Sequence, residues 1–257
     1  MENTERREKL KDFFYCIKEC SKCELSRTRT NFVFGSGNAN SKLMFVGEAP
    51  GKNEDLQGKP FVGQAGKLLD DLLSSIGFAR NEVFIANVLK CRPPQNRDPK
   101  LEEIDSCKNY LFEQIEIIEP AVICTLGKYS TQLLLNTEEG ITGLRGRIFK
   151  IDNIYILPIN HPAAALYTPS RMEILKVDFK RAAKVIKMLE SGDSDPSIII
   201  EDISGLQKKK NTISIKKYPE TKIHGSQQDS MIKEDNNNQK ELIDENSNPP
   251  AEQMGLF

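Results

Sequence analysis

Residues 43–51 read LMFVGEAPG, an apolar run that stops at a glycine and continues into a polar, glycine-rich segment. The four apolar residues Leu43–Val46 follow a lysine and end at Gly47. A short apolar run with such borders is typical of a buried strand. Three more runs of this kind, rich in β-branched residues, follow along the chain: Val83–Val88, Ala121–Leu126 and Ile154–Pro158. The sequence therefore predicts four buried strands.

Stretches with helical spacing lie before, between and after these strands. Residues 4–19 place Leu10, Phe13, Phe14 and Ile17 at three- and four-residue intervals, as one face of a helix does. Further helices are expected at Ala65–Ile76, about Leu101–Ile118, Lys128–Leu135 and Arg171–Leu189. Strands that alternate with helices favour a parallel sheet with helices on both faces. The predicted fold class is α/β: a three-layer α/β/α sandwich with a four-stranded parallel sheet, plus a disordered C-terminal tail.

The character of the chain changes at about Ser191. The segment 191–257 is rich in Asn, Gln, Ser and charge and has no sustained hydrophobic period, which is typical of disorder. We therefore predict one domain at 1–190 and a disordered tail at 191–257. Two apolar exceptions in the tail are Ile198–Ile200 and the last five residues, Gln253–Phe257.

Composition excludes some classes of protein and leaves others open. The formal net charge is −1, and residues 1–190 carry 28 Lys and Arg against 25 Asp and Glu, so charge alone does not indicate a nucleic-acid partner. No apolar run approaches the roughly 20 residues of a membrane span, and the N-terminus lacks the apolar core of a signal peptide. We expect a cytoplasmic monomer that does not bind membranes. In a reducing compartment its six cysteines favour a metal site over disulfides.

Four of the cysteines form two spaced pairs. Cys20 and Cys23 are a C-x2-C pair after the first helix, and Cys91, at a strand end, precedes Cys107 by sixteen positions. Four thiolates in two pairs suit either a tetrahedral zinc ion or a [4Fe–4S] cluster, and the spacing does not separate the two. The other two cysteines, Cys16 and Cys124, are interpreted as structural.

Polar residues gather where the predicted strands end, which is where parallel sheets bind ligands. The loop after the first strand carries Glu48, Glu54 and Asp55, which either face a site or are solvated loop charges. Phe61, inside GKPFVG at 58–63, either fills the core or stacks on a planar ligand. The glycines of this region allow a ligand to approach the backbone closely.

Two more polar residues follow other strands. Asn87 ends an otherwise apolar run, so its buried amide needs hydrogen-bond partners, either in a turn or on a ligand. His161, one of only two histidines, follows the fourth strand in NHPAAAL. Taken alone, it would more often be structural.

The motifs GEAPG-x2-ED, GKPFVG-x-AG, N-V-x-K-C-R-P-P and HPAAAL, in this order, resemble family 4 uracil-DNA glycosylases. The match runs from Cys20 to about Leu189 and implies the fold predicted above. It also implies excision of uracil from DNA, in single or double strands, from a flipped-out nucleotide. The family's [4Fe–4S] ligands fall on Cys20, Cys23, Cys91 and Cys107.

The resemblance also assigns roles at the strand ends. Phe61 is expected to stack on uracil and Asn87 to bond O4 and N3–H, with backbone groups of Gly47, Glu48 and Ala49 completing the cradle. His161 is expected to stabilise charge developing at O2. The water-positioning carboxylate is expected to be Glu54, with Glu48 as second choice, because Ala49 stands where a better-known superfamily branch has aspartate.

Two further segments carry expectations from known repair enzymes. Leu166 and Tyr167 follow HPAAA, where the superfamily inserts a wedge into the gap left by the flipped base. Gln253–Phe257, QMGLF, resembles the short peptides with which repair enzymes bind sliding clamps, bacterial or archaeal, and a long tether would favour such binding. This places the protein in a prokaryotic cell, near the nucleoid.

Two alternative functions remain open. One is a glycosylase of the same fold that acts on mismatched thymine or deaminated purines, and the other is a non-catalytic DNA-binding module stabilised by a cluster.

Overall fold

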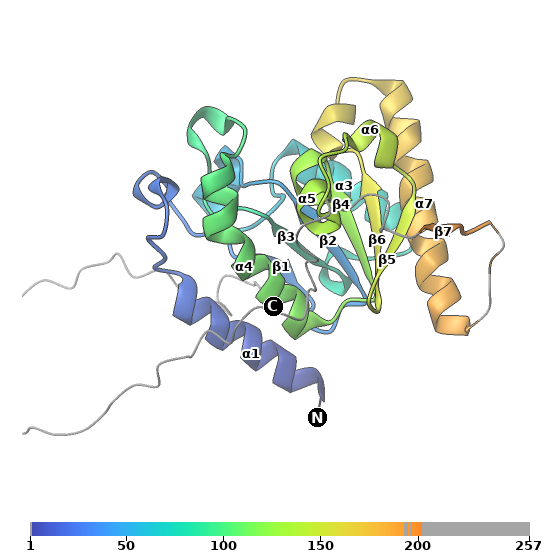
Figure 1. Ribbon diagram of the computed structural model, residues 1–257, viewed down its shortest axis with the longest axis horizontal. Coiled ribbons are helices and arrows are strands. Elements are labelled where there is room, and N and C mark those ends of the chain that lie inside the picture. Colours follow the sequence, from blue (N-terminus) through green and yellow to red (C-terminus); the bar gives the residue numbers. More distant parts are fainter. Residues whose placement is uncertain (1, 193–194, 196, 202–257) are drawn as a thin grey trace, which may run out of the picture.

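The protein is described by a computed structural model that covers residues 2–192, 195 and 197–201. Its centre is one seven-stranded sheet in the order β1-β3-β2-β4-β6-β5-β7 (Figure 1). The strands are β1 (Ser36–Gly37), β2 (Leu43–Gly47), β3 (Phe84–Asn87), β4 (Val122–Leu126), β5 (Ile148–Ile151), β6 (Ile154–Ile159) and β7 (Ile200–Glu201). The four predicted strands are β2, β3, β4 and β6, and they form a continuous parallel block.

Helices cover both faces of this sheet, which confirms the predicted three-layer fold (Figure 1). The α-helices are α1 (Glu2–Ile17), α2 (Lys52–Gln57), α3 (Gln64–Ser75), α4 (Leu101–Ile118), α5 (Lys128–Leu135), α6 (Ile141–Leu144) and α7 (Pro169–Ser191). Alternate residues of β2 point to opposite faces: Met44 packs with α1 and α4, whereas Phe45 packs with α3 and α7. Each face therefore has its own hydrophobic core.

Three strands, β1, β5 and β7, and two short α-helices, α2 and α6, were not predicted from the sequence. β5 and β6 form an antiparallel hairpin, and Asp152 between them has a left-handed φ of 51°. β1 adds two residues antiparallel to β3. The segment after Gly51, predicted as a loop, is the short helix α2, which ends at Gly58 in a left-handed conformation. Such short elements bury too few residues to leave a periodic signal.

The chain returns to the sheet after the predicted domain boundary. Helix α7 ends at Ser191, and β7 then pairs in parallel with β5, with Arg147 and Glu201 joined by an ion pair. The predicted disorder after residue 201 and the predicted clamp peptide Gln253–Phe257 lie outside the described residues. Within the described part of the chain, no helix is long and apolar enough to cross a membrane.

The order of the strands fixes where a site can form. From β2 the chain crosses to β3 on one side, and later to β4 on the other side of β2. At such a reversal the loops after neighbouring strands diverge and leave a crevice at the carboxyl edge of the sheet.

Candidate active site

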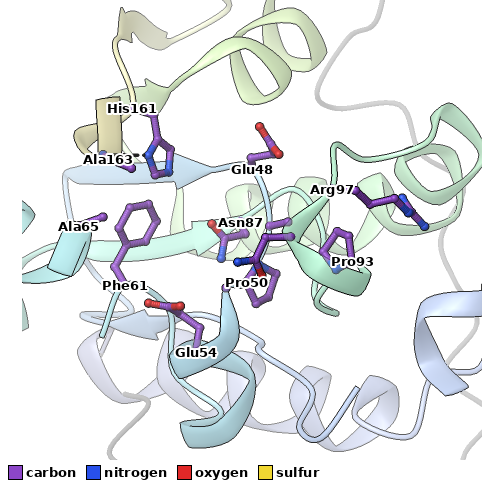
Figure 2. Close-up of a pocket in the computed structure, with 13 residues that line it drawn as sticks. Glu48, Pro50, Glu54, Phe61, Ala65, Asn87, Pro93, Arg97, His161 and Ala163 are labelled. Carbon is purple, nitrogen blue, oxygen red and sulfur yellow. Dashed lines mark hydrogen bonds between the residues drawn. The ribbon is translucent and has the colours of Figure 1, made fainter. Parts of the chain in front are cut away.

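A cavity of about 360 Å³ occupies this crevice (Figure 2). Its volume is in the range of small-molecule sites. The lining residues come mainly from the segments after β2, β3 and β6 and from the loop that begins α3: Glu48, Ala49, Pro50, Gly51, Glu54, Phe61, Ala65, Asn87, Pro93, Asn96, Arg97, His161 and Ala163. The structure thus brings together Glu48, Ala49, Glu54, Phe61, Asn87 and His161, as the sequence predicted.

Asn87 stands at the last position of β3 with its amide facing the cavity (Figure 2). The residue is only 2% exposed, and its Oδ1 has no hydrogen-bond partner among the described residues. A buried polar atom without a partner costs about 1–3 kcal/mol, so it points to a ligand that supplies the missing donor. Gly47, the register partner of Asn87 on β2, makes room for this amide, since a Cβ there would lie 2.3 Å from Oδ1.

Phe61 forms a wall of the cavity beside His161. Their ring centroids are 5.6 Å apart and their planes are inclined by 26°. Phe61 has a φ of 52°, which is uncommon for a bulky side chain and costs about 1–3 kcal/mol. The backbone of Gly66 packs so closely beneath it that a Cβ there would lie 1.9 Å from the Phe61 carbonyl oxygen. The surrounding structure therefore holds the Phe61 backbone in this uncommon conformation.

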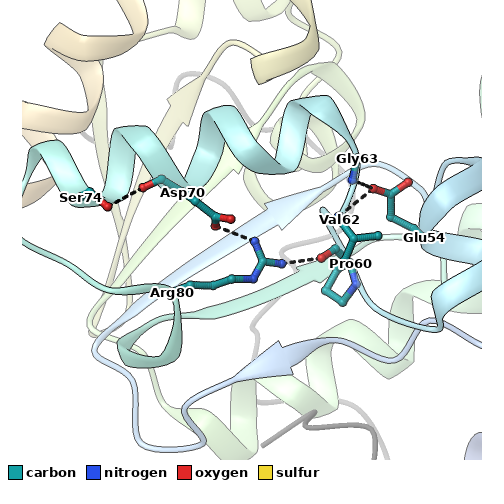
Figure 3. A network of polar contacts seen from close by, with 7 residues as sticks. All are labelled: Glu54, Pro60, Val62, Gly63, Asp70, Ser74 and Arg80. Carbon is teal, nitrogen blue, oxygen red and sulfur yellow. Dashed lines mark hydrogen bonds and ion pairs between the residues drawn. The ribbon is translucent and has the colours of Figure 1, made fainter.

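Polar contacts fix the chain on both sides of Phe61 (Figure 3). On one side Arg80 donates to the Pro60 carbonyl at 2.5 Å and to Asp70 at 2.8 Å. On the other side Oε1 of Glu54 accepts hydrogen bonds from the backbone N–H groups of residues 62 and 63, both at 2.9 Å. Sequence reasoning missed Arg80, because nothing in its local pattern distinguishes it from a surface charge.

Glu54 and Asp55, adjacent on α2, have different environments. Glu54 lines the cavity, as expected. Asp55 does not: it is buried on the other side of α2, where its carboxylate accepts from the backbone N–H groups of Thr30 and Asn31 at 2.9 and 3.3 Å. The expectation that Asp55 faces the site is therefore wrong, because adjacent positions of a helix point in directions about 100° apart.

His161 follows β6 and caps the short helix Pro162–Ala165. Its Nδ1 accepts a hydrogen bond from the N–H of Ala163 at 3.2 Å, so the ring proton resides on Nε2. Burial lowers the pKa of His161 to about 4, against a smaller opposing effect of Glu54. At neutral pH the ring is uncharged and has one N–H to donate.

Glu48 lies at the rim between His161 and Arg97 in Figure 2. Burial, and then the charge of Asp98, raise the pKa of Glu48 to about 7, and Lys128 opposes this. The backbone beside it is fixed, because the carbonyls of Gly47 and Glu48 accept from the N–H groups of Val88 and Leu89 at 3.0 Å.

The predicted wedge residues differ in exposure. Leu166 is partly buried and packs against the core between the sheet and α7. Tyr167 is 84% exposed and its hydroxyl donates to Gln64 at 3.2 Å, across from the loop that carries Phe61. The more accessible of the two is therefore the tyrosine.

The loop after Cys91 contributes cavity residues that sequence reasoning missed: Pro93, Asn96 and Arg97. Asn96 has a left-handed φ of 54°, and Arg97 forms an ion pair with the buried Glu103. Pro93 belongs to the motif N-V-x-K-C-R-P-P at 87–94, from which the sequence assigned roles only to Asn87 and Cys91, and Asn96 and Arg97 lie beyond the motif.

The four paired cysteines are close enough to affect one another's pKa, and all six cysteines are free thiols. Burial raises the pKa of Cys107 to about 12; the charge and backbone N–H of Lys90 oppose this, and the nearby thiols of Cys91 and Cys23 add smaller raising effects. Burial likewise raises the pKa of Cys91; the hydrogen bond and charge of Arg29 oppose this, and Cys23 and Cys20 add smaller raising effects. Among the described residues, no group of three or more His, Cys, Asp or Glu side chains is arranged to hold a metal ion.

Three of these four sulfurs accept hydrogen bonds. Cys20 Sγ accepts from the Tyr110 hydroxyl at 3.2 Å, Cys91 Sγ from the Arg29 guanidinium at 3.4 Å, and Cys107 Sγ from a backbone N–H at 3.4 Å. Donors aimed at sulfur, one of them cationic, suit thiolate ligands. Of the remaining two cysteines, Cys124 is buried as predicted for a structural residue, whereas Cys16 is exposed.

Fold and site together define a protein with a ligand-reading crevice at the switch point of a parallel sheet. The family model of the uracil DNA glycosylase superfamily matches residues 34–190, and the chain belongs to this superfamily. It is 45% identical to the type-4 uracil-DNA glycosylase of Archaeoglobus fulgidus, over 69% of this chain and 94% of that protein. It is 47% identical to the type-4 enzyme of Saccharolobus solfataricus (66% and 83% covered) and 42% identical to that of Thermotoga maritima (66% and 91%).

Proposed function

We propose that this protein removes uracil from DNA by hydrolysing the N-glycosidic bond of a flipped-out deoxyuridine, which leaves an abasic site. The observation that carries the proposal is the unpartnered, buried Oδ1 of Asn87 in the cavity. Family membership and relatives that are named type-4 uracil-DNA glycosylases support it. The cavity lining of the described residues contains no lysine, so it offers no amine for a Schiff base and fits a monofunctional hydrolase.

Base recognition rests on complementarity with the edge and face of uracil. Oδ1 of Asn87 accepts from uracil N3–H and Nδ2 donates to O4, whereas cytosine has a bare N3 and an amine at these positions. Phe61 stacks on the ring, and the fixed backbone of Gly47, Glu48 and Ala49 completes the cradle. A base without a donor at this position leaves Asn87 Oδ1 unpaired, and this lowers the affinity of the pocket for that base.

Cleavage moves the bonding electron pair onto uracil N1 and leaves a cation-like sugar. Neutral His161 donates its Nε2–H to O2, where negative charge develops, and one such donor is commonly worth about 10²–10³ in kcat. Glu54 orients the attacking water with Oε2, the oxygen not used by the loop N–H groups, and stabilises the sugar. The water oxygen bonds to C1′, its proton passes to the carboxylate, and uracil leaves as the anion.

The rim is proposed to hold the opened duplex. Tyr167, next in the chain to the partly buried Leu166, fills the gap in the base stack. Arg171 donates a hydrogen bond to the Ala164 carbonyl, and Lys176 forms an ion pair with Glu173. Both side chains therefore already have partners within the protein.

We also propose that Cys20, Cys23, Cys91 and Cys107 hold a [4Fe–4S] cluster. The donor set, the hydrogen bonds to sulfur and the type-4 relatives support this assignment, and the cluster would brace the loops on which the cavity depends. Purified protein is expected to be brown and to contain four iron atoms per chain, as the formula requires. Colourless protein that contains zinc would contradict the assignment.

Sliding-clamp binding through Gln253–Phe257 remains a proposal from the sequence. Deleting these five residues is expected to abolish co-purification with a clamp and to leave uracil release unchanged. Unaltered clamp binding after the deletion would contradict the idea.

The function is tested with a single-stranded oligonucleotide that contains one uracil, followed by alkali to cut abasic sites. Cleavage with uracil, and none with thymine or cytosine at the same position, is expected. Asn87→Leu, which fills similar space without polar atoms, is expected to lose most activity. Equal behaviour of the uracil and thymine substrates would contradict the proposal: cleavage of both would favour a broader glycosylase, and cleavage of neither a non-catalytic DNA-binding module.

A further inference from the structure

Lys90 is a titratable side chain that the proposed mechanism does not use, although it is completely buried. Its exposure is 0%, and its Nζ donates to the Asn87 carbonyl at 2.9 Å and to Gln114 Oε1 at 2.6 Å. Both acceptors are uncharged, and no carboxylate of the described residues forms an ion pair with Lys90. Lysines are almost never fully buried without a counter-charge, because desolvation of an ammonium group is costly. Its position therefore needs a physical reason.

The surroundings of Lys90 connect the two sites of the molecule. Its backbone N–H donates to Cys107 Sγ at 3.4 Å, and the next residue in the chain is Cys91. Its side chain folds back in the other direction to Asn87, three residues earlier. A single residue thus contacts a cysteine of the four-thiol site and the backbone of the residue proposed to read the base.

The second acceptor of Lys90 is held equally firmly. Gln114, on α4, is 0% exposed, accepts from Lys90 with Oε1 and donates with Nε2 to the Phe34 carbonyl at 3.0 Å. The Lys90 carbonyl accepts from the Val33 N–H at 2.8 Å. The polar groups of this buried turn are therefore paired and leave Lys90 little freedom to move.

We propose that Lys90 is a positioning residue that joins the cysteine site to the base-reading pocket: its ammonium group fixes the Asn87 carbonyl and balances the negative charge of a thiolate-bound cluster. The inference rests on the proposed function and on the proposed cluster. Four thiolates bring negative charge into a region of low dielectric, where a nearby cation interacts strongly. The cluster thereby gains a counter-charge, and Asn87 gains a fixed backbone.

The two roles make separate predictions. Lys90 holds the Asn87 carbonyl, which is the last group of β3. Because this carbonyl fixes the peptide plane next to the Asn87 Cα, it also fixes the direction of the Asn87 side chain. A misplacement of about 1 Å in a recognition group can reduce activity about 100-fold. Loss of the positive charge acts instead on the cluster, which is measured by its iron content and its visible absorbance without reference to activity.

Lys90→Met keeps the length and apolar stem of the side chain and removes its donors and charge. We expect less iron per chain, faster bleaching by a chelator, and, per loaded protein, an inhibition constant for free uracil that is raised about 10- to 100-fold. Lys90→Gln is the second variant, since it keeps a donor for the Asn87 carbonyl but has no charge. It is expected to recover part of the uracil affinity and none of the cluster retention.

Asp178→Asn is the matched control. Asp178 is also a 0% exposed titratable residue, but it pairs with Arg145 at 2.9 Å, and neither residue lines the cavity or is hydrogen-bonded to one of the four paired cysteines. It should leave iron content and uracil inhibition unchanged. The inference is overturned if Lys90→Met retains both at wild-type level, or if Asp178→Asn shows the same losses. Failure of the wild-type protein to release uracil would instead refute the proposed function, and the iron measurements would still test the charge role.

Discussion

Gly47→Ala is the smallest change that should disable the base-reading pocket. A Cβ at this position would lie 2.3 Å from Asn87 Oδ1 and 2.7 and 2.8 Å from two ring atoms of Phe61. The backbone itself permits alanine, because Gly47 is not among the glycines with left-handed φ. The atoms nearest to the added methyl group therefore belong to the two side chains that we propose to read uracil.

The size of the effect follows from these distances. Ordinary contact begins at 3.4 Å, so the Phe61 ring has to retreat by about 0.7 Å from the new methyl group. Its backbone cannot follow easily, because Gly66 packs directly beneath the Phe61 carbonyl. Overpacking of this kind costs about 1–3 kcal/mol of stability. A shift approaching 1 Å in a positioning group costs up to about 100-fold in rate, which we expect for kcat/KM on a uracil-containing oligonucleotide.

The assay measures uracil release under single-turnover conditions, together with the thermal unfolding midpoint. Gly143→Ala is the matched control, since a Cβ there would meet nothing within 4 Å and the φ is not left-handed. It should match the wild-type protein in rate and be no less stable. If Gly47→Ala keeps a rate within threefold of wild type while folded, Asn87 and Phe61 do not form the uracil site.

Three further predictions test other parts of the site. Arg80→Met should raise the inhibition constant for uracil about tenfold, because it frees the Phe61 loop. The loss of its partly exposed ion pair should lower the free energy of unfolding by only about 0.2–1 kcal/mol. The control Arg147→Met removes an ion pair of similar exposure and should change only stability. Because the pKa of Glu48 is raised to about 7, its carboxylate forms as the pH rises through 7, and we expect the wild-type rate to rise there and the Glu48→Gln rate to stay level; superimposable profiles would contradict this. His161→Leu should lower the single-turnover rate of uracil release about 10²–10³-fold, because it removes the Nε2–H that the neutral ring donates to O2 at neutral pH.

The four parallel strands could be predicted because each follows a continuous apolar run that is buried along most of its length. β2 and β4 are completely buried along their length, so hydrophobicity alone marks them. The same signal located the strand ends, and with them Asn87 and His161. It failed for β7, whose Ile200 is 42% exposed at the edge of the sheet and keeps its place partly through a long-range ion pair.

The contacts that shape the cavity could not be predicted, because they join residues distant in the chain. Arg80 reaches Pro60 twenty positions away, and Gln114 reaches Phe34 across 80 positions. No local pattern encodes such pairs. Asp55 shows a different kind of error. It is adjacent to Glu54 in the sequence, but both residues lie on the unpredicted helix α2, where their carboxylates face in different directions.

The proposed role of Glu54 gains support from the way its two oxygens are divided. Oε1 accepts from two adjacent loop N–H groups, which fixes the carboxylate without help from a cation and leaves Oε2 near Gly51, at the cavity. A short aspartate at position 49 would start from the end of β2, whereas a glutamate on α2 has to reach the same space from the side. The two N–H bonds remove the rotamer freedom that this longer side chain would otherwise retain, which is the requirement for orienting water. The same bonds hold the loop of Phe61, so the group that positions the water and the ring that stacks on the base are set by one carboxylate.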